Sequence, residues 1–290
     1  MTVEHECFLA LDPRRSRYDR SRFAVIPIPY DATSSYLGGA RHGPRAIIEA
    51  SAHLEDFDEE LEGEFTEAGI ATLPPVTADA RGPEHMVERI AGCARRVVRE
   101  GKFPLGLGGE HGITAGLVRA VHSRHRKLSV LQIDAHADLR DTYQGSRFSH
   151  ATVMRRVHEM GVRIVGVGLR IWSKGEAAFM RRNRIEPVTA RQCFESEGWL
   201  DAVLDRLDEK VYVTVDIDGI DPAYAPGTGT PVPGGLDWYQ VTSLLRAVAA
   251  EKTLVGADIT EVHPLAGQAA TEFLAARLAY KIICYAQHAE

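Results

Sequence analysis

Short apolar runs rich in β-branched residues alternate with longer amphipathic segments along the whole chain. A strand that is joined to the next strand through a helix-length segment runs parallel to it, because the crossover returns the chain to the same edge of the sheet. The pattern therefore predicts an α/β fold with a mostly parallel β-sheet flanked by helices. No linker, internal repeat or low-complexity stretch divides the 290 residues, so we expect a single domain over residues 1–290.

The individual elements follow from the same pattern. The predicted strands are Phe23–Ile28, Phe103–Leu107, Leu128–Ile133, Arg163–Val167, Val211–Ile217 and Leu254–Ile259. The predicted helices are Pro83–Glu100, Gly112–Arg124, Ala151–Met160, Gly175–Arg182, Trp199–Glu209, Leu236–Glu251 and Ala269–Tyr285. Gly63–Asp79 and Asp221–Gly235 are predicted to be long loops, which in a compact domain are often functional.

Charge and composition exclude several classes of protein. The formal net charge of -6 gives no long-range attraction for nucleic acid or an anionic membrane, and there is no polybasic arm. The first twenty residues contain no apolar core of signal-peptide length, and no window approaches the ~20 apolar residues of a membrane span. We therefore expect a cytoplasmic protein. Four scattered cysteines without a CxxC pair indicate ordinary buried or half-buried thiols: Cys7, Cys93, Cys193 and Cys284.

Clusters of acids and histidines follow three of the predicted strands. An open parallel sheet binds ligands beyond the carboxyl ends of its strands, so this is where a functional site is expected. Asp134, His136 and Asp138 follow Leu128–Ile133 at alternate positions. Alternate side chains of an extended segment point the same way, ~6.6 Å apart, so these three side chains can converge.

The other two clusters have the same placement. Asp216 and Asp218 end or follow the strand predicted over Val211–Ile217. His111 ends the run Gly108-Gly109-Glu110-His111, in which the glycines permit a tight turn at the end of the strand Phe103–Leu107. Each cluster alone also fits a structural role, because a histidine at a strand end is commonly hydrogen-bonded and an aspartate commonly caps the next helix.

Taken together, the three clusters predict a metal centre. Carboxylates gathered at one end of a sheet repel one another and raise one another's pKa unless cations neutralise them. Four aspartates and two histidines without cysteine favour Mn²⁺, and leave Mg²⁺, Co²⁺ and Fe²⁺ as alternatives. Six ligands are too many for one ion that keeps an open position, so we expect two ions ~3.5–4 Å apart that share carboxylates.

The motifs also carry a family resemblance, in both order and spacing. Gly108–His111, Asp134–Asp138 and Asp216-Ile217-Asp218-Gly219-Ile220-Asp221-Pro222 resemble the three signature motifs of the ureohydrolases. That family contains arginase, agmatinase, guanidinobutyrase, proclavaminate amidinohydrolase and formiminoglutamase. The resemblance extends from Pro29-Tyr30-Asp31 and Gly38–Pro44 to Thr260–Pro264. It implies an arginase-like, three-layer form of the α/β fold.

The resemblance further implies a binuclear manganese amidinohydrolase. One Mn²⁺ would be held by His111, Asp134, Asp138 and Asp216, and the other by His136, Asp134, Asp216 and Asp218. Asp134 and Asp216 would bridge the two ions. A water or hydroxide between the ions would supply the nucleophile, because two cations lower its pKa toward neutrality.

Two further residues match catalytic positions of the family. Glu261 matches the glutamate that binds the guanidinium group, and its alternative role is a turn or helix cap. His150 matches the histidine that carries a proton to the departing amine, although by itself it would also fit a helix start. His263 lies two positions after Glu261, so on an extended segment it would face the same cleft and compete with His150.

The substrate is the least constrained part of the prediction. Arginases place a small neutral amide after the Asp-x-His-x-Asp motif, whereas Leu139, Arg140 and Asp141 follow it here, which makes arginine a weaker candidate. The loop Pro226–Leu236 resembles the agmatinase branch, in which a second threonine lines the entrance, although it also fits a structural turn. Agmatine is therefore the first candidate. Arg140 would suit the carboxylate of guanidinobutyrate unless an acid such as Asp141 pairs with it, and aminopropylagmatine is a further alternative.

A non-enzymatic alternative is a metal-binding pseudoenzyme that keeps the fold. All six ligands, Glu261 and His150 are present, so we expect an enzyme whose partner is a small guanidino substrate. By the resemblance, the chain also forms a homo-oligomer, either a trimer or a hexamer.

Overall fold

A single eight-stranded sheet runs through the molecule. The computed structural model describes residues 7–288, so the prediction that the first twenty residues carry no signal sequence, and the domain bounds 1–290, lie partly outside the described residues. The strands are β1 (Phe23–Ile28), β4 (Ile70–Thr72), β5 (Phe103–Gly108), β6 (Ser129–Ile133), β7 (Arg163–Leu169), β8 (Val188–Thr189), β9 (Lys210–Asp216) and β10 (Thr253–Thr260). Their order is β4-β1-β5-β10-β9-β6-β7-β8, and every pair of neighbours is parallel.

The central strands are apolar because both faces of the sheet are covered. Along β1, Val25 belongs to one hydrophobic core, while Ala24 and Ile26 belong to a second core on the other face. The strands therefore show long buried runs with little polar alternation, as expected for a parallel sheet.

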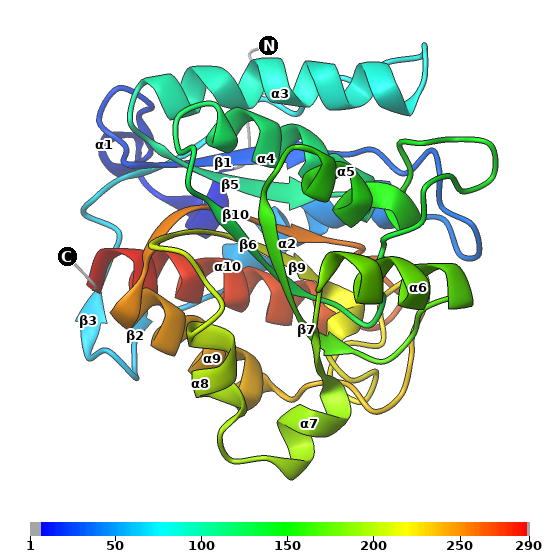
Figure 1. Cartoon of the computed structure of the whole chain (residues 1–290). Helices are drawn as coiled ribbons and strands as arrows, with labels where there is room; N and C mark the ends of the chain where they lie inside the picture. Colours follow the sequence, from blue (N-terminus) through cyan, green and yellow to red (C-terminus); the bar gives the residue numbers. More distant parts are fainter. Residues whose placement is uncertain (1–6, 289–290) are drawn as a thin grey trace.

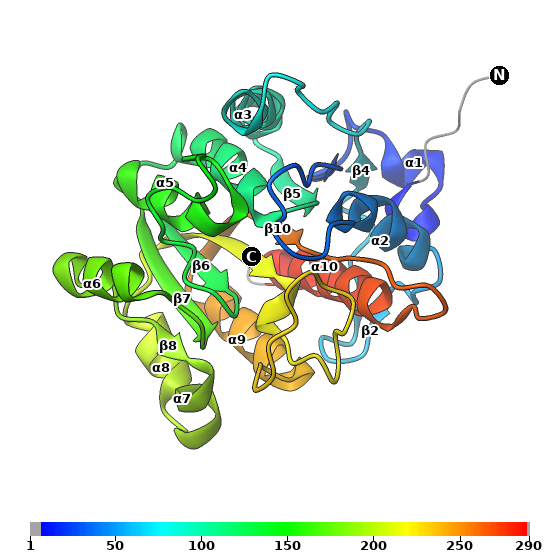
Figure 2. The same cartoon turned by 90° about the vertical axis from the view of Figure 1, so that its right-hand side faces the viewer.

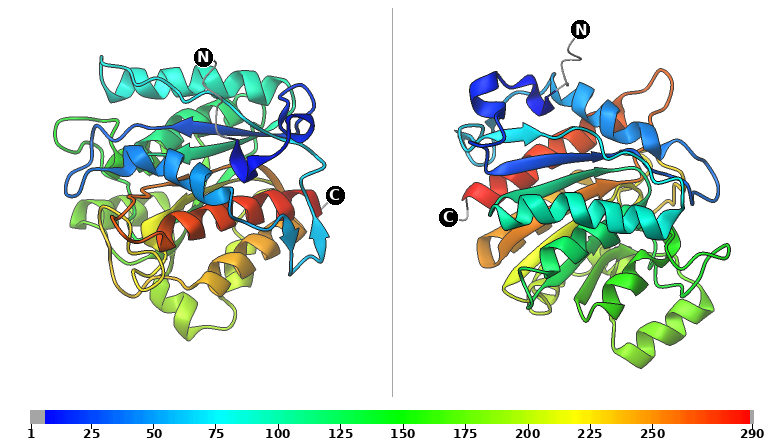
Figure 3. Two further views of the ribbon diagram at one scale, coloured as in Figure 1. Left: turned by 180° about the vertical axis from the view of Figure 1, so that it is seen from behind. Right: turned by 90° about the horizontal axis from the view of Figure 1, so that it is seen from above.

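Two layers of helices cover the sheet (Figures 1 and 3). The second core includes side chains of α3 (Pro83–Arg99), α4 (Thr114–His122), α5 (Val153–Glu159) and α6 (Lys174–Asn183). The first core includes α2 (Gly43–Ser51), α7 (Ala190–Glu195), α8 (Trp199–Leu204), α9 (Trp238–Glu251) and α10 (Ala270–His288). The three-layer α/β fold predicted from the sequence is thereby confirmed.

A small hairpin is attached to the end of the molecule where α10 ends. Its strands are β2 (Phe57–Asp58) and β3 (Gly63–Glu64). The Lys281 ammonium of α10 lies 2.9 Å from an Asp58 carboxylate oxygen and 3.1 Å from one of Glu60, and the Lys281 side chain is only 1% exposed. This buried ion pair fastens the hairpin to α10.

All six predicted strands are present, but several short elements were not predicted. Strand β4 lies inside the segment predicted to be the loop Gly63–Asp79, and β8 is only two residues long. These edge strands are too short to show a hydrophobic period. The helix predicted over Trp199–Glu209 ends at Leu204 as α8, and α2 was missed although Pro44 stands at its start, a position that favours proline. Cys93 is exposed on α3, contrary to the expectation of a buried or half-buried thiol.

The topology concentrates four strand ends at one place. Strands β5, β10, β9 and β6 are consecutive in the sheet, so the segments that follow them meet at its middle (Figure 2). Strand β10 comes last in the sequence but pairs with both β5 and β9. Within residues 7–288, no helix is long and apolar enough to cross a membrane.

Candidate metal centre

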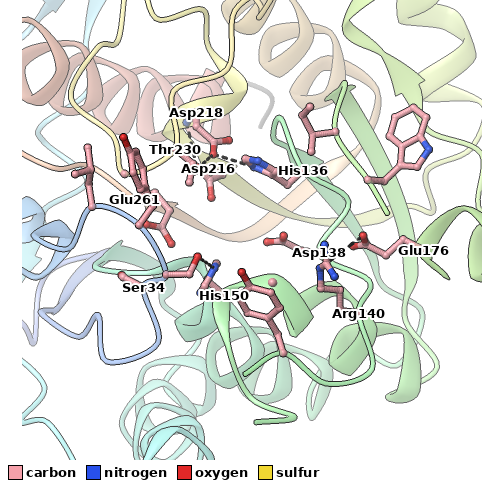
Figure 4. A pocket seen from close by; sticks show the side chains of 18 residues that line it. Ser34, His136, Asp138, Arg140, His150, Glu176, Asp216, Asp218, Thr230 and Glu261 are labelled. Carbon is pink, nitrogen blue, oxygen red and sulfur yellow. Dashed lines mark hydrogen bonds and ion pairs between the residues drawn. The ribbon is translucent and has the colours of Figure 1, made fainter. Parts of the chain in front are cut away.

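The six predicted ligands come from the ends of three of these four strands. His111 begins a short 3-10 turn after β5, and Asp134, His136 and Asp138 follow β6. Asp216 is the last residue of β9, and Asp218 lies in the 3-10 turn that follows it. Four of the six, His136, Asp138, Asp216 and Asp218, line one pocket, and Figure 4 shows their side chains around it.

Three carboxylates surround the His111 imidazole. Its Nδ1 lies 3.1 Å from an oxygen of Asp134, 3.0 Å from one of Asp138 and 3.4 Å from one of Asp216. His136 Nδ1 lies 3.0 Å from an oxygen of Asp218. The structure thus brings the predicted ligands together around two imidazoles.

Two sets of potential ligand atoms lie close enough together to hold a metal ion. One set is His111, Asp134 and Asp216, and the other is Asp134, His136 and Asp218; within each set the ligand atoms lie within 4.8 Å of one another. Asp134 belongs to both sets, in keeping with the bridging role that the family resemblance implies. Asp138 is outside both sets, although it contacts His111.

The carboxylates perturb one another strongly. Burial, together with repulsion from Asp134, raises the pKa of Asp138 to about 7. Burial and the neighbouring Asp218 and Asp134 raise the pKa of Asp216 well above its ordinary value. Burial by itself would lower the pKa of His136, but its hydrogen bonds to Asp134 and Asp218 overcome this and raise it to about 11. This cluster of acids and histidines retains protons because its pKa values are raised. Such a cluster fits divalent cations, which would neutralise the acids directly.

The predicted alternation holds only in part. Asp138 has a φ of 50°, in the left-handed region, so the segment Asp134–Asp138 is not extended to its end. Asp138 therefore reaches His111 through a turn of the backbone. Asp134 and His136 are held by a different contact: the Asp134 carboxylate accepts a hydrogen bond from the backbone N–H of His136 at 2.6 Å.

A buried polar network contacts the His111 ring at Nε2, the nitrogen that does not face the acids. Its Nε2 lies 2.9 Å from the Thr214 hydroxyl, which donates to Asp258 at 2.6 Å, and Tyr212 donates to the other Asp258 oxygen at 2.6 Å. Asp258 is fully buried, and burial raises its pKa despite these hydrogen bonds. The network turns Nδ1 of His111 toward the acids. Sequence reasoning missed it, because these residues lie within runs interpreted only as strands.

Glu261 follows β10 and opens onto the same pocket as the metal-ligand candidates. One of its oxygens accepts a hydrogen bond from the backbone N–H of His111 at 2.7 Å. Burial, with further contributions from Glu110 and Asp218, raises its pKa to about 8. The carboxylate lines a pocket of about 250 Å³ together with Asp216 and Asp218 (Figure 4).

His150 lines the same pocket from the wall opposite the β9 acids. Its Nδ1 lies 3.2 Å from the Thr33 hydroxyl, and its Nε2 lies 3.4 Å from the Ser35 hydroxyl. Burial, with the positive charges of His111 and His136, lowers its pKa to about 4. The imidazole is therefore neutral near pH 7.

His263 takes a different position from the one that alternation suggests. Glu261 has a φ of 61°, so the chain is not extended there and the alternate-residue rule fails. The His263 ring packs against Gly39, where an added Cβ would lie 2.6 Å from the ring, and His263 is not among the residues that line the pocket.

The entrance of the pocket holds a cation and an acid. Arg140 Nε lies 3.9 Å from an oxygen of Glu176, and its guanidinium lies 5.1 Å from the centroid of the Tyr143 ring. Asp141, the partner suggested by the sequence, instead pairs with Arg156 at 3.0 Å. Thr230, in the loop Asp221–Gly235, donates a hydrogen bond to Asp218 at 2.9 Å.

Comparisons with known proteins agree with this geometry. The family model described as the arginase family matches residues 21–284. The N(1)-aminopropylagmatine ureohydrolase of Synechocystis sp. is 39% identical over 275 residues, which cover 92% of this chain and 90% of that protein. The agmatinase of Pyrococcus horikoshii is 38% identical over 266 residues, 90% of each chain. The crystal structure of the agmatine ureohydrolase of Thermoplasma volcanium superposes with a TM-score of 0.86 at 32% identity, covering 95% of this chain and 93% of that one. This chain belongs to the arginase family and is a hydrolase.

Proposed function

We propose that this protein hydrolyses agmatine to putrescine and urea with the help of two Mn²⁺ ions. The observation that carries the proposal is the position of Glu261, a buried carboxylate that lines the same pocket as Asp216 from one set of metal-ligand candidates and Asp218 from the other. A guanidinium group bound to Glu261 would lie next to these candidates. The polyamine product and a homo-oligomeric state follow from the family resemblance and are parts of the same proposal, as is the cytoplasmic location expected from the sequence.

The ligand assignment is the one that the family resemblance implies. His111, Asp134, Asp138 and Asp216 would hold one ion, and His136, Asp134, Asp216 and Asp218 the other. Two divalent cations bound there would supply a nucleophile at neutral pH, because divalent cations lower the pKa of water that they bind. The Thr214–Asp258 network keeps Nδ1 of His111 available for the metal.

Glu261 would bind and orient the guanidinium group. A carboxylate pairs with the planar N–H groups of a guanidinium through two parallel hydrogen bonds, which fix the plane of the substrate carbon. The backbone N–H of His111 holds the Glu261 carboxylate in place. Because the pocket buries this carboxylate, a cationic substrate would find little competing water around it.

His150 would handle the proton that the leaving group needs. The C–N bond of the substrate breaks with its electron pair going to the departing amine, which must take up a proton. His150 is neutral near pH 7, so it can accept a proton from solvent and then pass it to that nitrogen. His150 lines the pocket wall, so it would lie beside a substrate bound there.

The candidate substrates differ in the group at the end opposite the guanidinium, which we call the tail. The Glu176 carboxylate lies close enough to Arg140 to offset part of its charge, which removes the main argument for a carboxylate tail and favours an amine. A second candidate is N(1)-aminopropylagmatine, because relatives from Synechocystis sp. and Thermus thermophilus are named N(1)-aminopropylagmatine ureohydrolase. Ile171 and Trp172 line the pocket and are 46% and 39% exposed, so a longer tail can extend over them.

A urea-release assay on a panel of substrates tests the proposal. Purified protein with measured Mn²⁺ occupancy is given agmatine, aminopropylagmatine, guanidinobutyrate and arginine. We expect the highest kcat/KM for agmatine, with aminopropylagmatine next. A higher value for guanidinobutyrate or arginine would contradict the tail assignment, and no urea from any of the four would contradict the proposed function.

The variant Trp172→Ala distinguishes the two amine substrates. If the longer tail lies over Trp172, kcat/KM for aminopropylagmatine falls more than that for agmatine. Phe194→Ala, which removes an exposed aromatic ring that is not a pocket residue, is the matched control.

A further inference from the structure

We propose that Thr33, held by Glu110, is a positioning residue that fixes the tautomer of His150, with the proton on Nδ1 and Nε2 free toward the pocket. The inference rests on the proposed role of His150 as proton carrier and adds to it the groups that set its chemical state. Glu110 precedes a candidate ligand in the sequence, and Thr33 lies in the loop after β1.

Glu110 and Thr33 are joined by two hydrogen bonds. One Glu110 oxygen accepts the backbone N–H of Thr33 at 2.6 Å, and the other accepts the Thr33 hydroxyl at 2.8 Å. Glu110 is 1% exposed, so water does not compete for these hydrogen bonds. Both carboxylate oxygens therefore hold a single residue, which joins the loop after β1 to the turn after β5.

The Thr33 hydroxyl can only accept hydrogen bonds from His150. A threonine hydroxyl has one hydrogen to donate and two lone pairs that accept. The hydrogen of Thr33 is directed to Glu110, so the oxygen can offer His150 only lone pairs. One of these accepts the backbone N–H of His150 at 3.1 Å, and the other faces His150 Nδ1 at 3.2 Å.

The contact with Thr33 determines which nitrogen of the His150 ring carries the hydrogen. If Nδ1 had no hydrogen, its lone pair would face a lone pair of Thr33 in a half-buried site, where an unmatched polar contact is costly. The hydrogen of the neutral ring is therefore placed on Nδ1, and Nε2 becomes the acceptor. The Tyr143 ring meets His150 edge-on, with centroids 5.5 Å apart and an interplanar angle of 86°, which restrains the plane of the imidazole.

This arrangement defines the path of the proton. Nε2 faces the side of the pocket where the Ser35 hydroxyl lies, 3.4 Å away. It takes a proton from solvent to give an imidazolium, with Nδ1–H still bound to Thr33. The imidazolium then returns that proton from Nε2 to the departing nitrogen, which has received the electron pair of the broken C–N bond, and the neutral ring is restored.

The first test reads the tautomer directly and does not depend on activity. Protein with ¹⁵N-labelled histidine is loaded with diamagnetic Mg²⁺, and the His150 ring signals are assigned by their absence in His150→Gln. We expect an N–H signal from Nδ1 and an unprotonated nitrogen signal from Nε2. Thr33→Val should lose this preference and Thr33→Ser should keep it. The opposite tautomer in the unmodified protein would overturn the proposal, whatever substrate the enzyme takes.

The second test is kinetic and uses the Mn²⁺-loaded enzyme. General acid–base catalysis typically contributes about 10²–10⁴-fold, so Thr33→Val should lower kcat by about tenfold or more, with KM nearly unchanged. Thr33→Ser should restore most of the rate, because it restores the hydroxyl. Equal metal content in all variants excludes an effect through the neighbouring His111.

A double variant shows whether Thr33 acts through His150. In a His150→Ala background, Thr33→Val should cause little further loss, because the group that it positions is already absent. The same fold-loss in both backgrounds, or no loss of kcat in Thr33→Val alone, would overturn the proposal. If the unmodified protein releases no urea, the proposed function fails, and the NMR test still decides the tautomer.

Discussion

Glu261 accepts a hydrogen bond from the backbone N–H of His111 at 2.7 Å, so the proposed guanidinium-binding carboxylate is attached to the same turn as a candidate metal ligand. The two groups come from different strands, β5 and β10, which are neighbours in the sheet. Any change at Glu261 can therefore act on the substrate, on the turn that carries His111, or on both. A substitution that preserves the hydrogen bond separates these effects.

Glu261→Gln is the informative change, because its amide oxygen can still accept the His111 N–H while the negative charge is lost. We expect kcat/KM for agmatine to fall by about 10²-fold or more, since a charge-assisted pair with the guanidinium is removed. Bound Mn²⁺, measured by elemental analysis, should stay the same. The control is Glu251→Gln, a change at an exposed residue at the end of α9. Near-normal kcat/KM in Glu261→Gln would remove Glu261 from guanidinium binding.

Removal of metal should abolish urea release and lower thermal stability together. A metal that binds only the folded protein stabilises it by about 2.7 kcal/mol at a free concentration 100 times the Kd. A chelator should therefore lower Tm, and added Mn²⁺ should restore both Tm and activity. In Asp134→Asn, which alters the residue shared by the two ligand sets, added Mn²⁺ should raise Tm much less. An equal rise of Tm in this variant would contradict its role as a ligand.

The depressed pKa of His150 predicts a pH-dependent stability. In the folded, metal-free protein this pKa is about 4, against an ordinary value of 6.5. Between these values the unfolded chain binds the proton more readily, so stability is lost as the pH falls from about 6.5 toward 4. The loss at pH 5, of the order of 2 kcal/mol, should be absent from His150→Gln. The measurement is the free energy of unfolding in denaturant at pH 7 and pH 5, for both metal-free proteins; identical pH dependence in the two would contradict the prediction.

The buried pair between Lys281 and Asp58 predicts a large effect on stability. Their side chains are 1% and 0% exposed, with nitrogen and oxygen 2.9 Å apart. Lys281→Met removes the nearer cation from the buried carboxylate, which keeps only Arg277 at 3.7 Å, and should cost about 3–5 kcal/mol, measured by denaturant unfolding. Replacing both residues, as in Lys281→Met with Asp58→Leu, should recover part of that loss, because the buried carboxylate is removed as well. A loss below 1 kcal/mol in Lys281→Met would contradict the prediction.

The sequence predicted the fold class and the six long strands, because buried parallel strands give long apolar runs. It also predicted which residues lie at the strand ends, since Asp134 and Asp216 directly follow such runs and His111 follows one after a short turn. It did not predict the order of strands in the sheet, which depends on packing between segments far apart in the chain. The positions of His263 and Asp138 were also beyond it, because both depend on a left-handed backbone conformation at Glu261 or Asp138 that no local pattern indicates.

The roles of Thr33 and Asp258 also could not be predicted from the sequence. Their roles arise from contacts across 77 and 44 residues of sequence, with Glu110 and Thr214 respectively. Nothing in the neighbouring residues distinguishes such a hydroxyl or carboxylate from an ordinary surface or strand residue. The family resemblance assigned the ligands and the two catalytic positions, and only the three-dimensional structure connects them to their supporting groups.

The insertion of β9 and β10 between β5 and β6 has a consequence for synthesis of the chain. A ribosome releases β1, β5, β6 and β7 long before Lys210, the first residue of β9, has been made. Until then, the facing edges of β5 and β6 have no partner, and unpaired strand edges are prone to aggregate. The nascent protein therefore carries an exposed gap from the synthesis of β6 until β9 and β10 have been made, and the centre closes only when these last two strands enter it.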